Sequence, residues 1–88
     1  MPAVVMYSTT YCGYCVRAKM LLQRRGIAFE EIDVTDDDEK RDWLRRTTKR
    51  RTVPQIFIHG QPIGGSDELH ALDRSGELAR LLERGSAA

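Results

Sequence analysis

The residues best suited to chemistry in this chain are Cys12 and Cys15, its only two cysteines. They lie three positions apart, directly after an apolar run at residues 4–7 and directly before a segment with helical spacing at residues 16–25. A thiol in the first turn of a helix lies near unpaired backbone N–H groups and the positive end of the helix dipole, so Cys12 is expected to ionise readily. Because the thiolate is the nucleophile in thiol–disulfide exchange, the pair predicts redox chemistry, with Cys12 attacking and Cys15 resolving.

Three other roles for two cysteines at this spacing stand beside redox chemistry. A structural zinc site needs four ligands, and the only histidines, His59 and His70, lie eleven positions apart, outside the usual ligand spacing. A permanent disulfide would close too short a loop to remove much entropy from the unfolded chain. Inert core cysteines remain possible, although the aromatic and glycine neighbours of a turn argue against them. Redox chemistry is the favoured interpretation.

Length and composition limit the class of protein. The 88 residues predict one domain over residues 1–88, and 41% hydrophobic with 31% charged residues indicates a folded globular chain. The first residues lack the features of a signal peptide, and no stretch approaches the ~20 apolar residues of a membrane span. We therefore expect a cytoplasmic protein that does not bind a membrane, in a compartment where a paired thiol is more often catalytic than structural.

The charge balance gives no strong indication of a nucleic-acid partner. The formal net charge is +1, although five of the seven residues at positions 45–51 are basic. We interpret this basic run as the solvated C-terminal end of a helix, where cations complement the helix dipole. No nucleic-acid binding is therefore expected.

Hydrophobic patterning predicts the strands that must hold the cysteines. Continuous β-branched and apolar runs predict strands at residues 3–7 and 52–59, and a turn at residues 59–61 leads into a short last strand at residues 62–63. Residues 27–34 also have strand-like composition, although the adjacent Glu30 and Glu31 break the alternation. A strand, a helix and a strand in succession imply a right-handed crossover and parallel pairing, whereas the hairpin implies antiparallel pairing.

Helical spacing and capping residues predict the helices. The first runs over residues 13–25 and is followed by Gly26, which suits a left-handed C-terminal cap. Thr35 is expected to cap the second helix, and Ser66 or Asp67 the third. A last helix carries leucines with helical spacing at residues 78–82. The predicted architecture is α/β: a four-stranded mixed sheet flanked by helices on both faces.

Three motifs then give the chain a resemblance to a known family. They are Cys-Gly-Tyr-Cys at residues 12–15, Arg-Thr-Val-Pro-Gln-Ile-Phe-Ile at residues 51–58, and Ile-Gly-Gly-Ser-Asp-Glu-Leu at residues 63–69. In this order and at these separations they resemble the motifs of dithiol glutaredoxins of the small bacterial type, over residues 4–82. The resemblance implies a thioredoxin fold and a glutathione-disulfide oxidoreductase that reduces glutathionylated and disulfide-containing proteins as a monomer, with glutathione as co-substrate.

The resemblance also implies a glutathione site. It implies a cis bond before Pro54, pairing of the Val53 backbone with glutathione as an added strand, and capture of the γ-glutamyl carboxylate and amine at Ser66 and Asp67. Glycines permit close approach of a ligand backbone, and a helix N-terminus favours a carboxylate, so the sequence suits such a site. Helix capping is the simpler role for Ser66 and Asp67, and a residue can both cap the helix and bind glutathione. The residues assigned to this site are Tyr14 beside the tripeptide, Arg41 near the glycyl carboxylate, Thr52, Val53, Pro54, Gly65, Ser66 and Asp67.

Two positions depart from the pattern of the family. Many dithiol glutaredoxins have proline where this chain has Gly13 and lysine where it has Thr9. In some members, loss of that proline accompanies a [2Fe–2S] cluster held between two subunits by the first cysteine, here Cys12, and glutathione. The alternative functions are therefore such a cluster-binding dimer, or an electron donor reduced by a thioredoxin reductase.

Overall fold

The computed structural model describes residues 2–10 and 12–86. Four strands form one mixed sheet in the order β2-β1-β3-β4: β1 (Val4–Ser8), β2 (Phe29–Asp33), β3 (Gln55–Ile58) and β4 (Gln61–Gly64). Strand β1 pairs in parallel with β2 and antiparallel with β3, and β3 pairs antiparallel with β4. The predicted mixed sheet is confirmed, with β1 in its interior.

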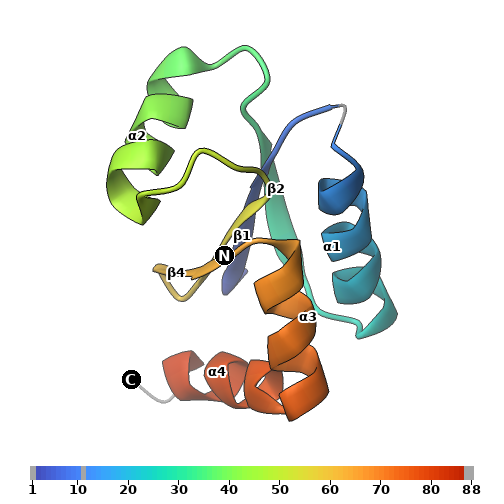
Figure 1. Ribbon diagram of the computed structural model, residues 1–88. Helices are drawn as coiled ribbons and strands as arrows, with labels where there is room; N and C mark the ends of the chain where they lie inside the picture. Colours follow the sequence, from blue (N-terminus) through green and yellow to red (C-terminus); the bar gives the residue numbers. More distant parts are fainter. Residues whose placement is uncertain (1, 11, 87–88) are drawn as a thin grey trace.

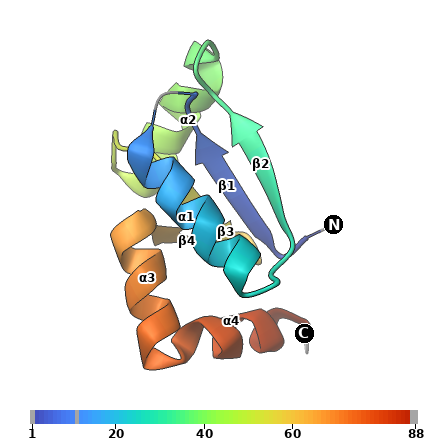
Figure 2. The same ribbon diagram turned by 90° about the vertical axis from the view of Figure 1, so that its right-hand side faces the viewer.

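Helices cover both faces of this sheet, as predicted (Figures 1 and 2). They are α1 (Gly13–Arg24), α2 (Asp38–Thr48), α3 (Ser66–Ser75) and α4 (Glu77–Ser86). In Figure 1, α2 lies to the left of the sheet, and α1 and α3 lie to its right. The parallel pair β1 and β2 is thus joined by a crossover through α1, as the strand–helix–strand pattern requires.

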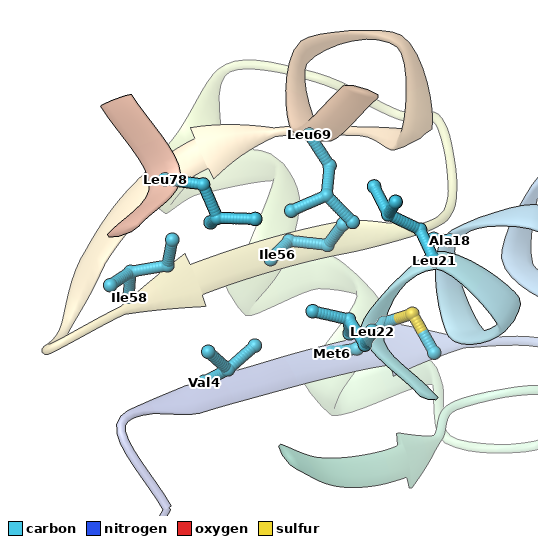
Figure 3. Close-up of a cluster of buried hydrophobic side chains, with 9 residues drawn as sticks. All are labelled: Val4, Met6, Ala18, Leu21, Leu22, Ile56, Ile58, Leu69 and Leu78. Atoms are coloured by element: carbon cyan, nitrogen blue, oxygen red, sulfur yellow. The ribbon is translucent and has the colours of Figure 1, made fainter. Parts of the chain in front are cut away.

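The main core lies between the sheet and helices α1, α3 and α4 (Figure 3). Its fully buried side chains come from alternate positions of β1 and β3 and from the apolar stripes of the helices: Val4, Met6, Ala18, Leu21, Leu22, Ile56, Ile58, Leu69 and Leu78. A smaller cluster of Val34, Leu44 and Phe57 packs under α2 on the opposite face. Because β1 and β3 are covered on both faces, their sequences are almost continuously apolar.

Two predicted helix caps are wrong. Thr35 does not cap α2: its N–H and hydroxyl both donate to Asp33 Oδ1, at 2.8 and 2.6 Å, and the cap is Asp37, which accepts from the Lys40 N–H at 3.0 Å. Helix α3 begins at Ser66 itself, with Gly65 as its N-cap, so neither Ser66 nor Asp67 is the capping residue. Asp33 holds the Thr35 hydroxyl in the first case, and in the second Glu68 Oε1 accepts from the N–H of the N-cap Gly65 at 2.6 Å.

The end of α1 and the starts of β2 and β3 also differ from the predicted ranges. Helix α1 ends at Arg24, and Gly26 adopts the predicted left-handed conformation with φ 67°. The Ile27 N–H then donates to Leu22 O at 2.9 Å, which closes the turn after α1, and β2 begins only at Phe29. Residues 52–54 precede β3, since Pro54 has no N–H to donate to a ladder. The Val53–Pro54 bond is cis, as the resemblance implied.

Candidate active site

Cys12 occupies the N-cap position of α1, at the end of the loop that follows β1. Its backbone is extended, and its Sγ accepts a hydrogen bond from the Cys15 N–H at 3.1 Å. This N–H is one of the donors that a helix leaves unpaired at its start, and the Cys12 sulfur supplies its acceptor. The Cys12 side chain is half-buried and reachable from solvent. The predicted nucleophile therefore lies where both accessibility and the helix terminus favour it.

Cys15 differs sharply from Cys12, although both are free thiols in this structure. Only 2% of Cys15 is exposed, because it faces the core side of α1. Burial, the hydrogen bond with Cys12 and the nearby charges of Cys12 and Glu31 raise the pKa of Cys15 to about 12, against an opposing hydrogen bond with the Thr9 backbone. Cys15 is thus protonated at neutral pH, which suits a thiol that acts second.

The loop before β3 lies directly against the cysteines. The Cys12 thiol donates to the Val53 carbonyl oxygen at 3.5 Å, across 41 residues of sequence. Val53, Pro54 and Thr52 also line a cleft of about 230 Å³. Val53 therefore joins the reactive sulfur to this cleft.

The cleft gathers the residues that the sequence assigned to glutathione, with one exception. Tyr14 from α1 lines it together with Thr52, Val53, Pro54, Gly65, Ser66 and Asp67. Arg41 lies in an adjoining groove of about 540 Å³ between α2 and the loop before β3, and this groove shares Thr52 and Val53 with the cleft. The structure thus places Arg41 beside the cleft rather than in it, and its contact with a glycyl carboxylate stays a prediction.

The N-terminus of α3 forms the far end of the cleft. Ser66 is buried and Asp67 exposed, one turn above Leu69 in the core. Backbone N–H groups at the start of this helix favour a carboxylate, whereas the Asp67 carboxylate favours an ammonium group. The two charges of an α-amino acid, such as the γ-glutamyl end of glutathione, match this arrangement.

Two further residues of the cleft were not identified from the sequence. Arg50 Nη1 donates to Glu68 Oε1 at 2.7 Å, and the same oxygen accepts from the Gly65 N–H at 2.6 Å. These bonds, that of Gly65 first and that of Arg50 second, hold the pKa of the Glu68 carboxyl below its usual range. Glu68 follows the N-cap by three residues, a capping spacing that the sequence contains, whereas Arg50 lies in the run interpreted as solvated.

This contact explains why glycine stands at residue 64. Gly64 has φ 113°, and a Cβ there would lie 2.5 Å from Glu68 Oε1. At Gly65 a Cβ would lie 3.1 Å from the Pro54 carbonyl oxygen. The two glycines let the Pro54 loop, the end of β4 and the Glu68 side chain approach closely, which fixes the shape of the cleft.

Comparison with known proteins identifies the family. A sequence model described as Glutaredoxin matches residues 4–63. The chain belongs to the glutaredoxin family. It is 51% identical over 82 residues to a glutaredoxin of Pseudomonas aeruginosa, covering 93% of this chain and 98% of that protein. It is also 45% identical over 83 residues to glutaredoxin 3 of Escherichia coli K12, covering 94% of this chain and all of that protein (100%).

Solved structures of the family share the fold. The structure of a buckwheat glutaredoxin–glutathione complex matches with a TM-score of 0.88 and 35% identity, covering 98% of this chain and 81% of that one. The predicted thioredoxin fold of the α/β class is thus confirmed. Membership of the family, with the paired thiols at the start of α1, is consistent with glutathione-dependent thiol redox chemistry.

A metal centre within the described part of the chain is not apparent. No group of three or more His, Cys, Asp or Glu side chains among residues 2–10 and 12–86 is placed to hold a metal ion. In the predicted [2Fe–2S] arrangement this chain would supply only Cys12, whose free, half-buried thiol suits that role. The other ligands would come from glutathione and a second subunit, so the cluster stays a prediction. No helix in the described residues is both long and apolar enough to cross a membrane.

Proposed function

We propose that the chain is a glutathione-dependent thiol–disulfide oxidoreductase that reduces protein–glutathione mixed disulfides and protein disulfides, as a cytoplasmic monomer. The observation that carries this proposal is the position of Val53. Its carbonyl oxygen contacts the Cys12 thiol, and the same residue lines the cleft that ends at Ser66 and Asp67. A tripeptide in the cleft would therefore present its sulfur next to Cys12.

The proposed reaction begins with the Cys12 thiolate. It attacks the glutathione sulfur of a glutathionylated protein, and the protein thiolate leaves and takes up a proton. Cys12 is then joined to glutathione in a mixed disulfide. A second glutathione thiolate attacks the glutathione sulfur of that mixed disulfide, which releases oxidised glutathione and restores the Cys12 thiolate.

Named residues of the cleft would hold the glutathionyl group during these steps. The Val53 backbone would pair with the tripeptide backbone, and Tyr14 would flank it. The start of α3 at Ser66 would bind the γ-glutamyl carboxylate, and Asp67 the ammonium. Arg41, from the adjoining groove, would meet the glycyl carboxylate.

Cys15→Ser should keep deglutathionylation and lose the reduction of protein disulfides. The first reaction uses only Cys12 and free glutathione, whereas resolving a mixed disulfide between Cys12 and a client protein requires the second thiol. Both rates are measured as NADPH oxidation coupled through glutathione reductase, first with a small glutathione mixed disulfide and then with a disulfide-bonded protein. Loss of both activities in a folded Cys15→Ser variant would contradict the proposed monothiol path.

Asp67→Asn should raise the KM for a small glutathione mixed disulfide about tenfold, with kcat changed less. The substitution removes a charge-assisted hydrogen bond to the substrate ammonium, a contact worth about 1.5–3 kcal/mol. Asp36→Asn is the matched control, since Asp36 is also exposed but lies in the loop before α2. An equal KM in both variants would remove Asp67 from the glutathione site.

A further inference from the structure

Cys15 must lose a proton before it can resolve a mixed disulfide between Cys12 and a client protein. The thiol is 2% exposed, and burial, the first cause of its raised pKa, persists when Cys12 is in the mixed disulfide. Only a small fraction of such a thiol is ionised at neutral pH, and solvent reaches it poorly. A nearby proton acceptor would remove this obstacle.

A further cavity, separate from the glutathione cleft, lies beside the cysteines. Its volume is about 330 Å³, and Cys12 and Cys15 both line it together with Lys19 from α1 and Glu31 from β2. No lining residue of this cavity also lines the glutathione cleft. The volume is large enough for water, because a water molecule takes about 30 Å³ of liquid.

Glu31 is fixed at the wall of this cavity. Its Oε2 accepts from the hydroxyl of the buried Ser8 at 2.8 Å, and its Oε1 lies 2.9 Å from Lys19 Nζ. Glu30 and Glu31, which break the alternation expected of a strand, point to opposite faces of the sheet because successive side chains of a strand do so. The charge of Glu30 acts on Tyr7, whereas that of Glu31 acts on Cys15.

We propose that Glu31 is the proton acceptor for Cys15 in the resolving step, with water in the cavity as the carrier. The proposal rests on the dithiol part of the proposed function. The Cys15 proton passes to the Glu31 carboxylate, and Cys15 Sγ bonds to Cys12 Sγ. The bond between Cys12 and the client sulfur breaks, and its electron pair leaves with the client thiolate. The client is reduced, the cysteine pair is oxidised to a disulfide, and Glu31 returns its proton to solvent.

Charge explains how Glu31 assists the transfer at this place. Ionised Glu31 opposes a second negative charge on Cys15, so moving the proton between them removes the repulsion as the thiolate forms. Lys19, released from its ion pair by protonation of Glu31, then remains as a cation beside the new thiolate. Cys12 carries no charge at this stage, because its sulfur is in the mixed disulfide.

The other acidic residue at the cavity is less suited to accept the proton. Asp33 also lines it, but its charge is not among the causes that shift the pKa of Cys15, whereas that of Glu31 is. The Thr9 Oγ1 atom is itself buried and has no hydrogen-bond partner among the described residues. The Thr9 backbone is itself bonded to Cys15.

The test measures closure of the Cys12–Cys15 disulfide in the full chain. Reduced protein is mixed with excess disulfide-bonded peptide, quenched with acid at set times, and the mixed disulfide and the closed disulfide are separated by mass. Glu31→Gln should slow closure about 10²-fold at pH 7, so that the mixed disulfide accumulates. The rate of closure in this variant should then rise about tenfold for each unit of increase in pH. Glu30→Gln, the control on the opposite face, should stay within about twofold of the unsubstituted chain.

A purely structural charge predicts the reverse effect. Removing Glu31 would then lower the pKa of Cys15, so closure as fast as or faster than in the unsubstituted chain overturns the proposal. Glu31→Asp should recover part of the rate, because it restores the carboxylate. Deglutathionylation by Cys15→Ser and by Cys15→Ser/Glu31→Gln should be equal within about twofold, which also shows that the second variant is folded. Failure of Cys15→Ser itself would instead count against the proposed function.

Discussion

Cys12→Ser should abolish deglutathionylation, with a loss of kcat/KM of about 10³-fold or more, because the attacking sulfur is removed and a serine hydroxyl stays protonated. The half-buried Cys12 Sγ is the sulfur that contacts Val53 at the cleft, whereas Cys15 is buried behind it. The measurement is the coupled rate with a small glutathione mixed disulfide. Cys15→Ser is the matched control, with the same atoms exchanged three residues away.

Loss of activity in Cys12→Ser should not come from unfolding. Serine is a preferred N-cap, so its oxygen can accept from the Cys15 N–H as the sulfur does now. The free energy of unfolding should therefore change by less than about 0.5 kcal/mol, measured by urea denaturation. Residual deglutathionylation comparable to that of the unsubstituted chain would remove Cys12 from the role of nucleophile.

Leu69→Ala should lower the free energy of unfolding by about 2–5 kcal/mol, the range for a buried leucine truncated in a well-packed core. Leu69 is fully buried on α3 and packs in the main core with Met6, Leu22 and Ile56 (Figure 3). The same side chain secures the helix whose first turn carries Ser66 and Asp67. Urea denaturation of the reduced protein gives the value directly.

Leu72→Ala is the matched control for this prediction. Leu72 lies on the same helix but is only partly buried against the core. Its truncation should cost clearly less, since less apolar surface is returned to water and a smaller cavity remains. Equal losses at the two positions would show that Leu69 does not anchor α3 as its burial indicates.

Much of the fold could be predicted because local and global signals agree in β1 and α1. Residues 4–7 are apolar and β1 is covered on both faces, and Gly26 follows the end of α1 in the left-handed conformation that its sequence position suggested. The start of α2 was predicted wrongly for a physical reason. Asp33, at the end of β2, accepts hydrogen bonds from the N–H and hydroxyl of Thr35, and these bonds depend on where the strand ends.

The candidate site also has a part that the sequence predicts and a part that it does not. The cysteine pair and the Pro54 and Ser66 motifs are contiguous in sequence, so they could be identified before the fold was known. The bond between Arg50 and Glu68 joins residues 18 positions apart, and the one between Ser8 and Glu31 joins residues 23 apart. Such contacts exist only after the sheet has formed, so no short sequence pattern predicts them.

The most direct test of the central claim is to trap glutathione on Cys12. Cys15→Ser is treated with oxidised glutathione, and its intact mass and peptide masses are measured before and after addition of reduced glutathione. The account predicts one glutathionyl group, located on Cys12, that reduced glutathione removes with release of oxidised glutathione. A folded protein that acquires no such group, or one that reduced glutathione does not remove, would contradict it.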